Sequence, residues 1–251
     1  MTNNFYSENQ WGSEPTRSFA EQREKKIINY IQKRLNTSVG TALDIGCGDG
    51  FFLNYFHNQF PNWSLTGIDG SKSQLKKAEN RKLTNEKVKF QFFEVADRLP
   101  FEDQTFDFIM LGEVIEHLVD PDKCVQECYR LLKPNGVFVV TTPNLFSWYN
   151  RVLMFFGVSP LFIEYSTNDS SVGYGILKKI KFDKKPVGHL RIFHPEALID
   201  LLSLYNFKDI KIEGACFEPL PHKIKFFDKL LANIWPRGAS LLISFGKKSN
   251  M

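Results

Sequence analysis

The stretch LDIGCGDG at residues 43–50 joins a short apolar run to a helical pattern over residues 51–60. Glycines in such a strand-to-helix turn let the backbone bend tightly and let a ligand approach peptide N–H groups without a Cβ in the way. The dinucleotide fingerprint would require glycine at position 51, where the sequence has Phe51. A P-loop would need Gly-Lys followed by Ser or Thr, which the sequence lacks. The stretch therefore predicts a nucleotide-binding turn of another kind.

Outward from this turn, near-continuous apolar strands alternate with helical patterns, as is typical of βαβ units around a buried parallel sheet. The sequence predicts an α/β fold: a doubly wound, mostly parallel, seven-stranded Rossmann-like sheet with helices on both faces and an inserted lid after strand five. Strands are expected over residues 42–45, 65–68, 88–93, 106–111, 137–142, 210–217 and 241–245. Helices are expected over residues 19–35, 51–60, 74–82, 122–132, 195–205 and 230–234, with a further helix running through residue 118.

The composition is that of an ordinary globular protein: 251 residues, 43% hydrophobic, 24% charged, with 4 cysteines. It excludes disordered, collagen-like and disulfide-scaffold classes. The N-terminus lacks an apolar signal-peptide core, and the longest apolar stretch, of about 12 residues, falls short of the roughly 20 that a spanning helix needs. We expect a cytoplasmic protein with a single domain over residues 1–251. Its parts are an N-terminal helical lead (1–36), a cofactor-binding core (37–145), a lid or substrate insertion (146–187) and the C-terminal part of the sheet (188–251).

Charge and aromatic residues are unevenly distributed along the chain. Residues 1–150 hold 17 Lys+Arg against 19 Asp+Glu, whereas residues 151–251 hold 15 against 9. Seven aromatic rings fall within residues 146–165, just after the fifth strand, where open α/β sheets bind ligands. One interpretation is a lid over an apolar acceptor, with peripheral membrane contact through residues 146–187 and the lysines of 178–185 facing anionic lipid. The other is an additional helical layer that buries its own rings.

Four stretches at ordered spacing resemble the class I S-adenosylmethionine-dependent methyltransferases, over roughly residues 40–145. They are LDIGCGDG (43–50), GIDGS (67–71), LPFEDQTFDFIMLGEVIEHL (99–118) and RLLKPNGVFVVTTPN (130–144). Asp69 closes the second strand, where it can accept hydrogen bonds from both ribose hydroxyls of a nucleoside or, alternatively, serve as a helix N-terminal carboxylate. The resemblance implies S-adenosyl-L-methionine as the cofactor.

The resemblance also implies roles for individual residues. The loop with Gly46, Cys47 and Gly48 lies against the methionine part of the cofactor, and Asp44 helps to set that loop. Asp69, followed by Gly70, holds the ribose; Glu94 and Asp97 compete for the position near the adenine; and Leu111 and Glu113 line the pocket near the sulfonium.

Glu113, Glu116 and His117 stand at i, i+3 and i+4, so on a helix they share one face. The run is similar to one in ubiquinone-pathway O-methyltransferases and in methyltransferases of the 3′-terminal ribose of small RNAs. In some of these it carries metal ligands, with a further histidine downstream; here that histidine is His189. We expect His117 and His189 to be catalytic and no metal to be bound. The alternative is a divalent ion on Glu113, Glu116, His117 and His189.

The expected function is O-methylation of a small-molecule or lipid-linked acceptor, either a glycan or a phenol or quinone precursor. The runs TTPNLFSWYNR (141–151) and GHLRIFHPEAL (188–198) are similar to bacterial and archaeal methyltransferases of cell-surface polysaccharide or lipid-linked glycan pathways. Alternatives are an RNA 3′-terminal ribose methyltransferase and a non-catalytic cofactor-binding protein on the same fold. Nucleic acid is not favoured as a partner because the sequence contains no recognisable RNA-binding module. The sequence does not predict the oligomeric state.

Overall fold

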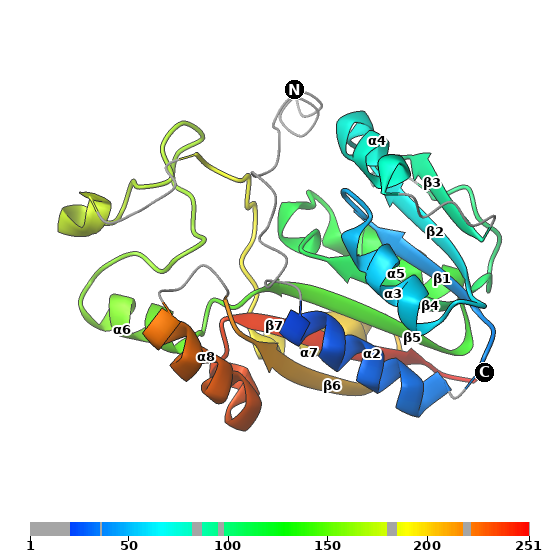
Figure 1. The fold of residues 1–251 in the computed structure, drawn as a ribbon. Coiled ribbons are helices and arrows are strands. Elements are labelled where there is room, and N and C mark those ends of the chain that lie inside the picture. Colours follow the sequence, from blue (N-terminus) through cyan, green and yellow to red (C-terminus); the bar gives the residue numbers. More distant parts are fainter. Residues whose placement is uncertain are drawn as a thin grey trace.

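The computed structural model describes residues 21–35, 37–81, 87–94, 98–179, 185–217 and 222–250. Its centre is a seven-stranded sheet with the strand order β3-β2-β1-β4-β5-β7-β6 (Figure 1). The strands are β1 Thr41–Ile45, β2 Ser64–Asp69, β3 Val88–Phe92, β4 Phe106–Gly112, β5 Leu132–Pro143, β6 Phe207–Ala215 and β7 Leu241–Lys248. Strand β7 runs antiparallel to both of its neighbours, and the other pairs are parallel. The predicted mostly parallel seven-stranded sheet is confirmed.

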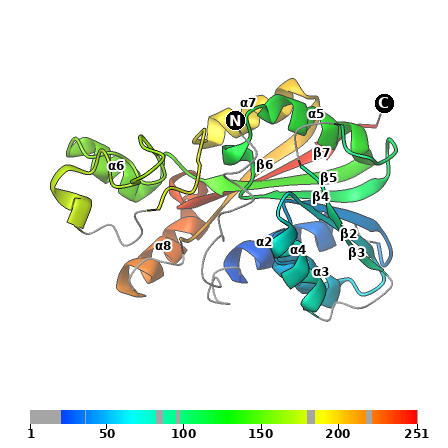
Figure 2. The ribbon, with the colours of Figure 1, turned by 90° about the horizontal axis from the view of Figure 1, so that it is seen from above.

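Helices cover both faces of the sheet (Figure 2). Helices α2 Glu21–Leu35, α3 Phe51–Gln59 and α4 Lys72–Asn80 lie on one face, and α5 Pro121–Leu131 and α7 Pro195–Leu204 lie on the other. Strand β4 shows why two cores form: Phe108 and Met110 join one buried cluster and Ile109 and Leu111 the other, because successive strand side chains point to opposite faces. Both faces of the sheet are therefore covered by apolar side chains, so a polar site is expected at the strand ends.

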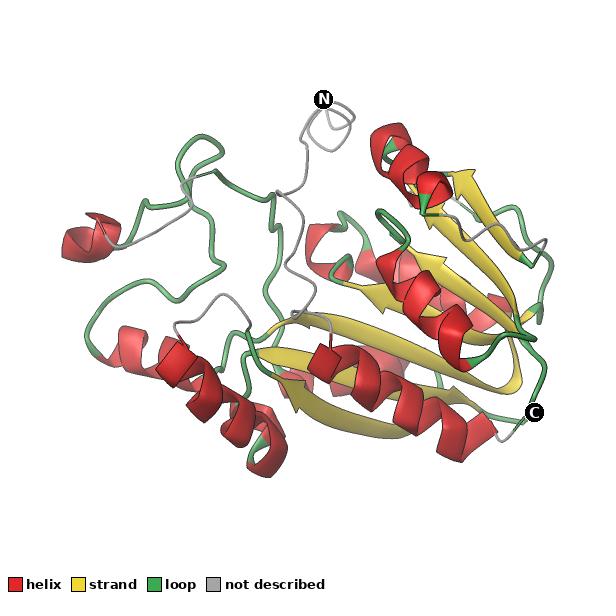
Figure 3. Cartoon of the chain, viewed as in Figure 1, coloured by secondary structure: helices red, strands yellow, loops and turns green. Residues whose placement is uncertain are grey.

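The chain beyond β5 departs from the doubly wound pattern. Helix α6 Trp148–Phe155 and the 3₁₀ turn η2 Gly175–Lys179 belong to the insertion, and α8 His222–Ile234 and the 3₁₀ turn η3 Pro236–Gly238 lie between β6 and β7. The insertion leaves β5 at its carboxyl end and lies outside the sheet, with α6 and α8 at the same end of the molecule (Figure 3). None of the helices in the described ranges has both the length and the apolar character to cross a bilayer.

Two predicted helices differ from the structure. The helix expected through residue 118 is only a 3₁₀ turn, η1 Ile115–His117. Glu113 before it has a left-handed φ of 54°, and Pro121 after it starts α5 with Asp120 as the N-cap. The residue before a proline is driven out of the helical region, so the segment is too short for an α-helix. The helix expected at residues 230–234 is longer, because α8 begins at His222.

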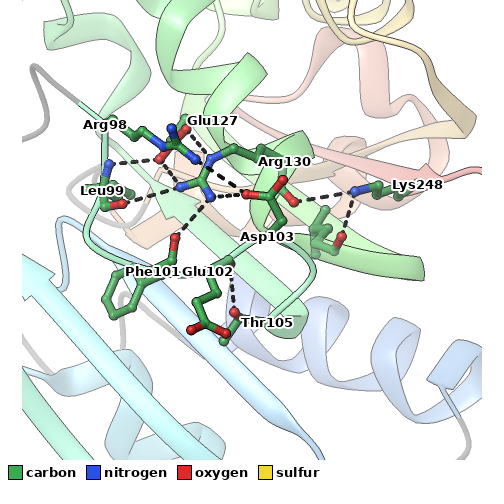
Figure 4. Close-up of polar contacts among 10 residues, drawn as sticks. Arg98, Leu99, Phe101, Glu102, Asp103, Thr105, Glu127, Arg130 and Lys248 are labelled. Atoms are coloured by element: carbon green, nitrogen blue, oxygen red, sulfur yellow. Dashed lines mark hydrogen bonds and ion pairs between the residues drawn. The ribbon is translucent and has the colours of Figure 1, made fainter.

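An arginine holds the loop before β4 against α5 (Figure 4). The Arg130 guanidinium donates to both carboxylate oxygens of Glu127, at 2.8 and 2.5 Å, and to Asp103 Oδ1 at 2.5 Å. It also donates to the carbonyl oxygens of Phe101, at 2.9 Å, and Leu99, at 3.3 Å. One side chain therefore fixes a loop with no secondary structure of its own, and with it the start of β4.

Candidate active site

The glycine turn between β1 and α3 has the open backbone that the sequence predicts. Gly46, Gly48 and Gly50 have φ angles of 72°, 53° and 75°, which L side chains rarely adopt. A Cβ on Gly46 would lie 2.3 Å from Val114 Cγ2, so the segment that follows β4 packs directly on the turn. A Cβ on Gly48 would meet no atom within 4 Å among the described residues. The space above Gly48 is where a ligand can approach the backbone.

Asp69 ties this turn to the next helix. Its Oδ2 accepts a hydrogen bond from Gly48 N at 2.8 Å, and its Oδ1 accepts one from Ser71 N at 2.7 Å. Burial raises the pKa of Asp69, and the two hydrogen bonds act against that shift. Each carboxylate oxygen has a second lone pair, so Asp69 can still accept from a ligand hydroxyl. Both of the roles considered for it, ligand acceptor and carboxylate before a helix, are compatible with its position.

The two candidates for the adenine end have different outcomes. Glu94 follows β3 and is exposed, and its Cγ lies 3.9 Å from where a Cβ on Gly70 would be. It therefore lies at the same strand-end edge as Asp69. Asp97 lies outside the described residues.

Asp44 on β1 is a buried carboxyl group to which no described residue donates. It is 4% exposed, and no hydrogen bond reaches its side chain from the described part of the chain. Burial raises the pKa of Asp44 to about 8; Asp69 and Glu24 raise it further, and Arg23 acts in the opposite direction. A cationic ligand is the partner that would relieve such a group, since an opposite charge within a few ångströms favours ionisation.

Sequence reasoning missed two residues at the start of α2. Arg23 donates to Glu24 Oε1 through Nε at 2.9 Å and through Nη2 at 2.8 Å, and its Nη1 lies 3.5 Å from Glu113 Oε1. Glu24 is fully buried, and its Oε2 has no hydrogen-bond partner within the described ranges. The signal was present, because Glu24 precedes Ile27, Ile28 and Ile31 on the apolar stripe of the helix. A carboxylate on that stripe marks a polar site at the helix start.

Glu116, His117 and His189 come together although the two histidines are far apart in the sequence. One ligand atom from each lies within 4.8 Å of the others, and the two imidazole centroids are 4.9 Å apart. The backbone brings them together, because Glu116 O accepts from Leu190 N at 2.8 Å and from Arg191 N at 3.1 Å. Glu113 does not belong to this trio. Its Oε1 accepts a hydrogen bond from Thr141 Oγ1 at 2.7 Å, and its left-handed φ turns the backbone before η1 begins.

Both histidines are oriented by main-chain carbonyl groups. His117 Nδ1 lies 3.0 Å from Gly188 O, and His189 Nδ1 lies 3.0 Å from Phe162 O. A carbonyl oxygen only accepts, so each Nδ1 carries the proton in a neutral ring and the lone pair falls on Nε2. Burial lowers the pKa of His117 to about 4, so this ring is neutral at pH 7. Burial, reinforced by Glu113, raises the pKa of Glu116 well above its ordinary value.

Glu164 in the insertion is a further residue that sequence reasoning missed. Its carboxylate accepts from Val187 N at 2.6 Å, Gly188 N at 2.8 Å and His189 N at 3.2 Å. These three bonds fold the His189 segment against the insertion. Within the aromatic stretch 146–165 it is the single acidic residue, and that isolation was the available signal.

Two predicted cofactor residues turn their side chains into the protein. Cys47 is 7% exposed and Leu111 is fully buried, each within a hydrophobic core. Cys47 N donates to Ile68 O at 3.0 Å, which holds the turn against β2. These two residues can therefore contact a ligand only through their backbone atoms.

Comparisons with known proteins bear on the same residues. Residues 43–140 match the family described as methyltransferase domain. The ubiquinone/menaquinone biosynthesis C-methyltransferase UbiE of Desulfotalea psychrophila is 30% identical over 125 residues, which are 49% of this chain and 49% of that protein. A ubiquinone biosynthesis O-methyltransferase of Xylella fastidiosa is 33% identical over 118 residues, 47% of each. Residues 43–140 are a methyltransferase domain.

The chain spans about half the length of the curated relatives that it matches. Among solved structures, a SAM dependent methyltransferase from Archaeoglobus fulgidus has a TM-score of 0.61 at 20% identity, covering 93% of this chain and 95% of that one. This likeness concerns the fold. The methyltransferase domain match contains Asp44, the glycine turn, Asp69 and the Glu113–His117 run, whereas Glu164 and His189 lie outside it.

Proposed function

We propose that the chain is an S-adenosylmethionine-dependent methyltransferase that methylates a hydroxyl oxygen of a small-molecule or lipid-linked acceptor. The observation that carries the proposal is the convergence of Glu116, His117 and His189 beside the glycine turn. The trio and the glycine turn are close, since Val114, two residues before Glu116, packs on Gly46. This proximity supports a single site that combines a nucleotide-type turn with a proton-accepting group.

The charges of the site fit this cofactor. Five carboxyl groups, those of Glu24, Asp44, Asp69, Glu113 and Glu116, act on one another electrostatically, with Arg23 as the balancing cation. Glu24 Oε2 and the Asp44 carboxyl group receive no hydrogen bond from the residues that the structure describes. S-adenosylmethionine carries a sulfonium and an ammonium group, so it offers positive charge to this acidic neighbourhood. The resident residues thus suit a cationic nucleoside better than a dinucleotide phosphate.

Bound there, S-adenosylmethionine supplies a methyl group on a sulfonium, with the sulfur retaining the electron pair of the broken C–S bond. The protein must orient the acceptor and remove its proton. His189 Nε2 is the proposed acceptor of that proton, because the ring is held through Nδ1 at 3.0 Å from Phe162 O. His117, neutral at pH 7, stands next to it as a second oriented imidazole.

The same trio supports a second role, as a divalent-ion site. Metal-ligating histidines commonly donate their other ring N–H to a backbone carbonyl, and both rings have that arrangement. Two imidazoles and one carboxylate favour a softer ion such as Zn²⁺ over Mg²⁺. An ion here would lower the pKa of the acceptor hydroxyl in place of a base.

The acceptor is proposed from the walls of the site and from the relatives. Phe162 contacts His189, with ring centroids 6.0 Å apart, and Phe217, at 5.2 Å, so the acceptor side is aromatic. Some relatives are named as ubiquinone-pathway methyltransferases of carbon or of oxygen. The oriented imidazole pair favours oxygen, whose proton has to be removed. A phenolic quinone precursor with an apolar tail therefore fits best, with a lipid-linked glycan as the other acceptor.

Calorimetry and turnover test the proposal separately. Titration with S-adenosylhomocysteine should give binding, and titration with NAD should not. Methyl transfer to a catechol-type phenol should fall by at least about a hundredfold in His189→Ala, whereas His57→Ala on α3 should match the wild type. Tight binding with turnover that is unchanged in His189→Ala would refute the base. Turnover that survives a chelator, together with no heat on titration with Zn²⁺ or Mn²⁺, would exclude the ion.

A further inference from the structure

Large apolar side chains are exposed at the end of the molecule that carries α6 and α8. Phe155 is 83% exposed, Phe156 73%, Phe226 70% and Ile234 69%. Further exposed apolar residues in these two segments are Val152, Met154, Ile224, Phe227, Leu230 and Trp235. We call these ten residues the α6–α8 face. A soluble surface tolerates single apolar residues, whereas a gathered set marks an interaction site.

Helix α8 shows that the exposure is built into the sequence. Phe226, Phe227, Leu230 and Ile234 recur at helical spacing and form one stripe, which is exposed. The opposite side of the helix is buried and carries Asp228 and Ala232, both fully buried. The helix therefore turns its carboxylate inward and its aromatic rings outward, which is the reverse of an ordinary surface helix.

The two helices are joined directly. Trp148 Nε1 donates to Asp228 Oδ1 at 2.8 Å, and the Trp148 and Phe227 rings meet edge to face with centroids 5.5 Å apart. The Arg151 guanidinium lies 5.4 Å from the Trp235 ring centroid. The apolar residues of α6 and α8 thus belong to connected parts of one surface.

The charge on this face has one sign. Helix α8 carries Lys223, Lys225 and Lys229, and α6 carries Arg151. Asp228 is the one acidic residue in either helix, and it is fully buried with its oxygens bonded inside the protein. Exposed aromatic residues flanked by cations, on two helices without an exposed carboxylate, complement the interface of an anionic bilayer.

We propose that the α6–α8 face docks on a bilayer that contains anionic lipid. The inference deepens the proposed function and rests on it for its purpose, since docking would present a lipid-linked acceptor to the site. The chain supplies the route: after α6 the insertion returns to the site, where Phe162 O holds His189 Nδ1 and Glu164 holds the His189 backbone.

Vesicle flotation of the full chain tests the docking. We expect flotation with phosphatidylcholine vesicles that contain phosphatidylglycerol, weak flotation with phosphatidylcholine alone, and loss of binding at high salt. The double variant Phe226→Ser, Leu230→Ser should lower partitioning at least about tenfold, as should Lys223→Glu, Lys229→Glu. The matched control is Leu204→Ser, which removes an exposed apolar residue, 67% exposed, from α7.

Three outcomes would overturn the docking proposal. The first is no flotation with either kind of vesicle, and the second is flotation that the α8 variants leave unchanged. The third is a wild-type dimer in sedimentation that the α8 variants convert to a monomer, without any dependence on lipid. The last would assign the face to a second copy of the chain. Titration of the same samples with S-adenosylhomocysteine distinguishes the two proposals. A wild type that does not bind S-adenosylhomocysteine would count against the methyltransferase proposal, whereas the flotation result alone would decide the docking proposal.

Discussion

Replacing Asp44 by asparagine should stabilise the ligand-free protein while weakening its binding of cofactor. The native pKa of Asp44 is about 8 against an ordinary value of 3.8. Between these values the folded protein holds a proton that the unfolded chain has released, so stability falls as the pH rises. At pH 7 the difference is about three pH units, which at about 1.36 kcal/mol per unit gives about 4 kcal/mol. The Asp44→Asn variant would lack this penalty because its amide side chain stays neutral.

Thermal or urea unfolding of both proteins from pH 5 to pH 8 measures the effect. For a chain of this length, about 4 kcal/mol corresponds to a rise in Tm of roughly 10 °C at pH 7. The gap between the variant and the wild type should shrink towards pH 5. Asp107→Asn is the control with the opposite sign: Asp107 Oδ2 accepts from Thr41 N at 2.8 Å and lies 2.7 Å from Lys133 Nζ, so its loss should destabilise by about 1–3 kcal/mol.

Cofactor binding gives an independent test of the protonation state of Asp44. A bound cation should ionise Asp44, so at pH 7 the wild type should release close to one proton on binding S-adenosylmethionine. Calorimetry in buffers of different ionisation enthalpy detects that proton. The variant should release none and bind at least about tenfold more weakly. The reasoning would be refuted if the variant were no more stable than the wild type at pH 8, or if proton release were the same in both.

Three further expectations concern positioning and stability. Arg130→Ala should destabilise by about 3 kcal/mol in urea unfolding, because two carbonyl groups and two carboxylates lose a donor. Arg98→Ala, with its side chain 74% exposed, should change stability by less than about 0.5 kcal/mol; equal effects would contradict the network. Glu164→Gln should lower kcat about tenfold with unchanged S-adenosylhomocysteine affinity, since it loosens the His189 segment; an unchanged kcat would remove this role. Gly48→Ala should lower cofactor affinity at a stability loss of about 1 kcal/mol, and Gly46→Ala should destabilise more because of Val114; the reverse order would contradict the geometry.

The central strands of the sheet could be predicted from the sequence because they are buried on both faces. A strand such as residues 137–142 has no polar side to confuse with a helix pattern, and its βαβ context fixes a parallel neighbour. The segment at residues 113–118 could not be predicted in the same way. Its apolar and polar spacing suits an α-helix, but the left-handed φ of Glu113 and the constraint before Pro121 stop the helix. The restriction before Pro121 is local, whereas the left-handed φ of Glu113 is not encoded by the apolar and polar spacing of the segment.

The site was predictable where its residues lie at strand ends. The glycine turn and Asp69 follow from topology, because the carboxyl ends of parallel strands meet at one edge, whereas the role of Asp44 was an expectation from resemblance. The meeting of His117 with His189 was an expectation from resemblance, and the geometry depends on a backbone pairing between Glu116 and residues 190–191 that no local pattern encodes. Arg23 and Glu24 were missed because the apolar stripe of an amphipathic helix predicts which face is buried and not which polar groups that face meets.

The carboxylate of Asp228 joins three segments of the second half of the chain. Its oxygens accept from Trp148 Nε1, Phe217 N at 2.7 Å and Ser240 Oγ at 2.7 Å, which belong to the insertion, the end of β6 and the approach to β7. All these segments lie beyond residue 140, outside the matched methyltransferase domain. A chimera in which the whole chain after β5 is exchanged would therefore keep the hydrogen bonds of Asp228 intact. We therefore expect such a chimera to fold better when Trp148 and Asp228 come from the same parent than when they come from different parents.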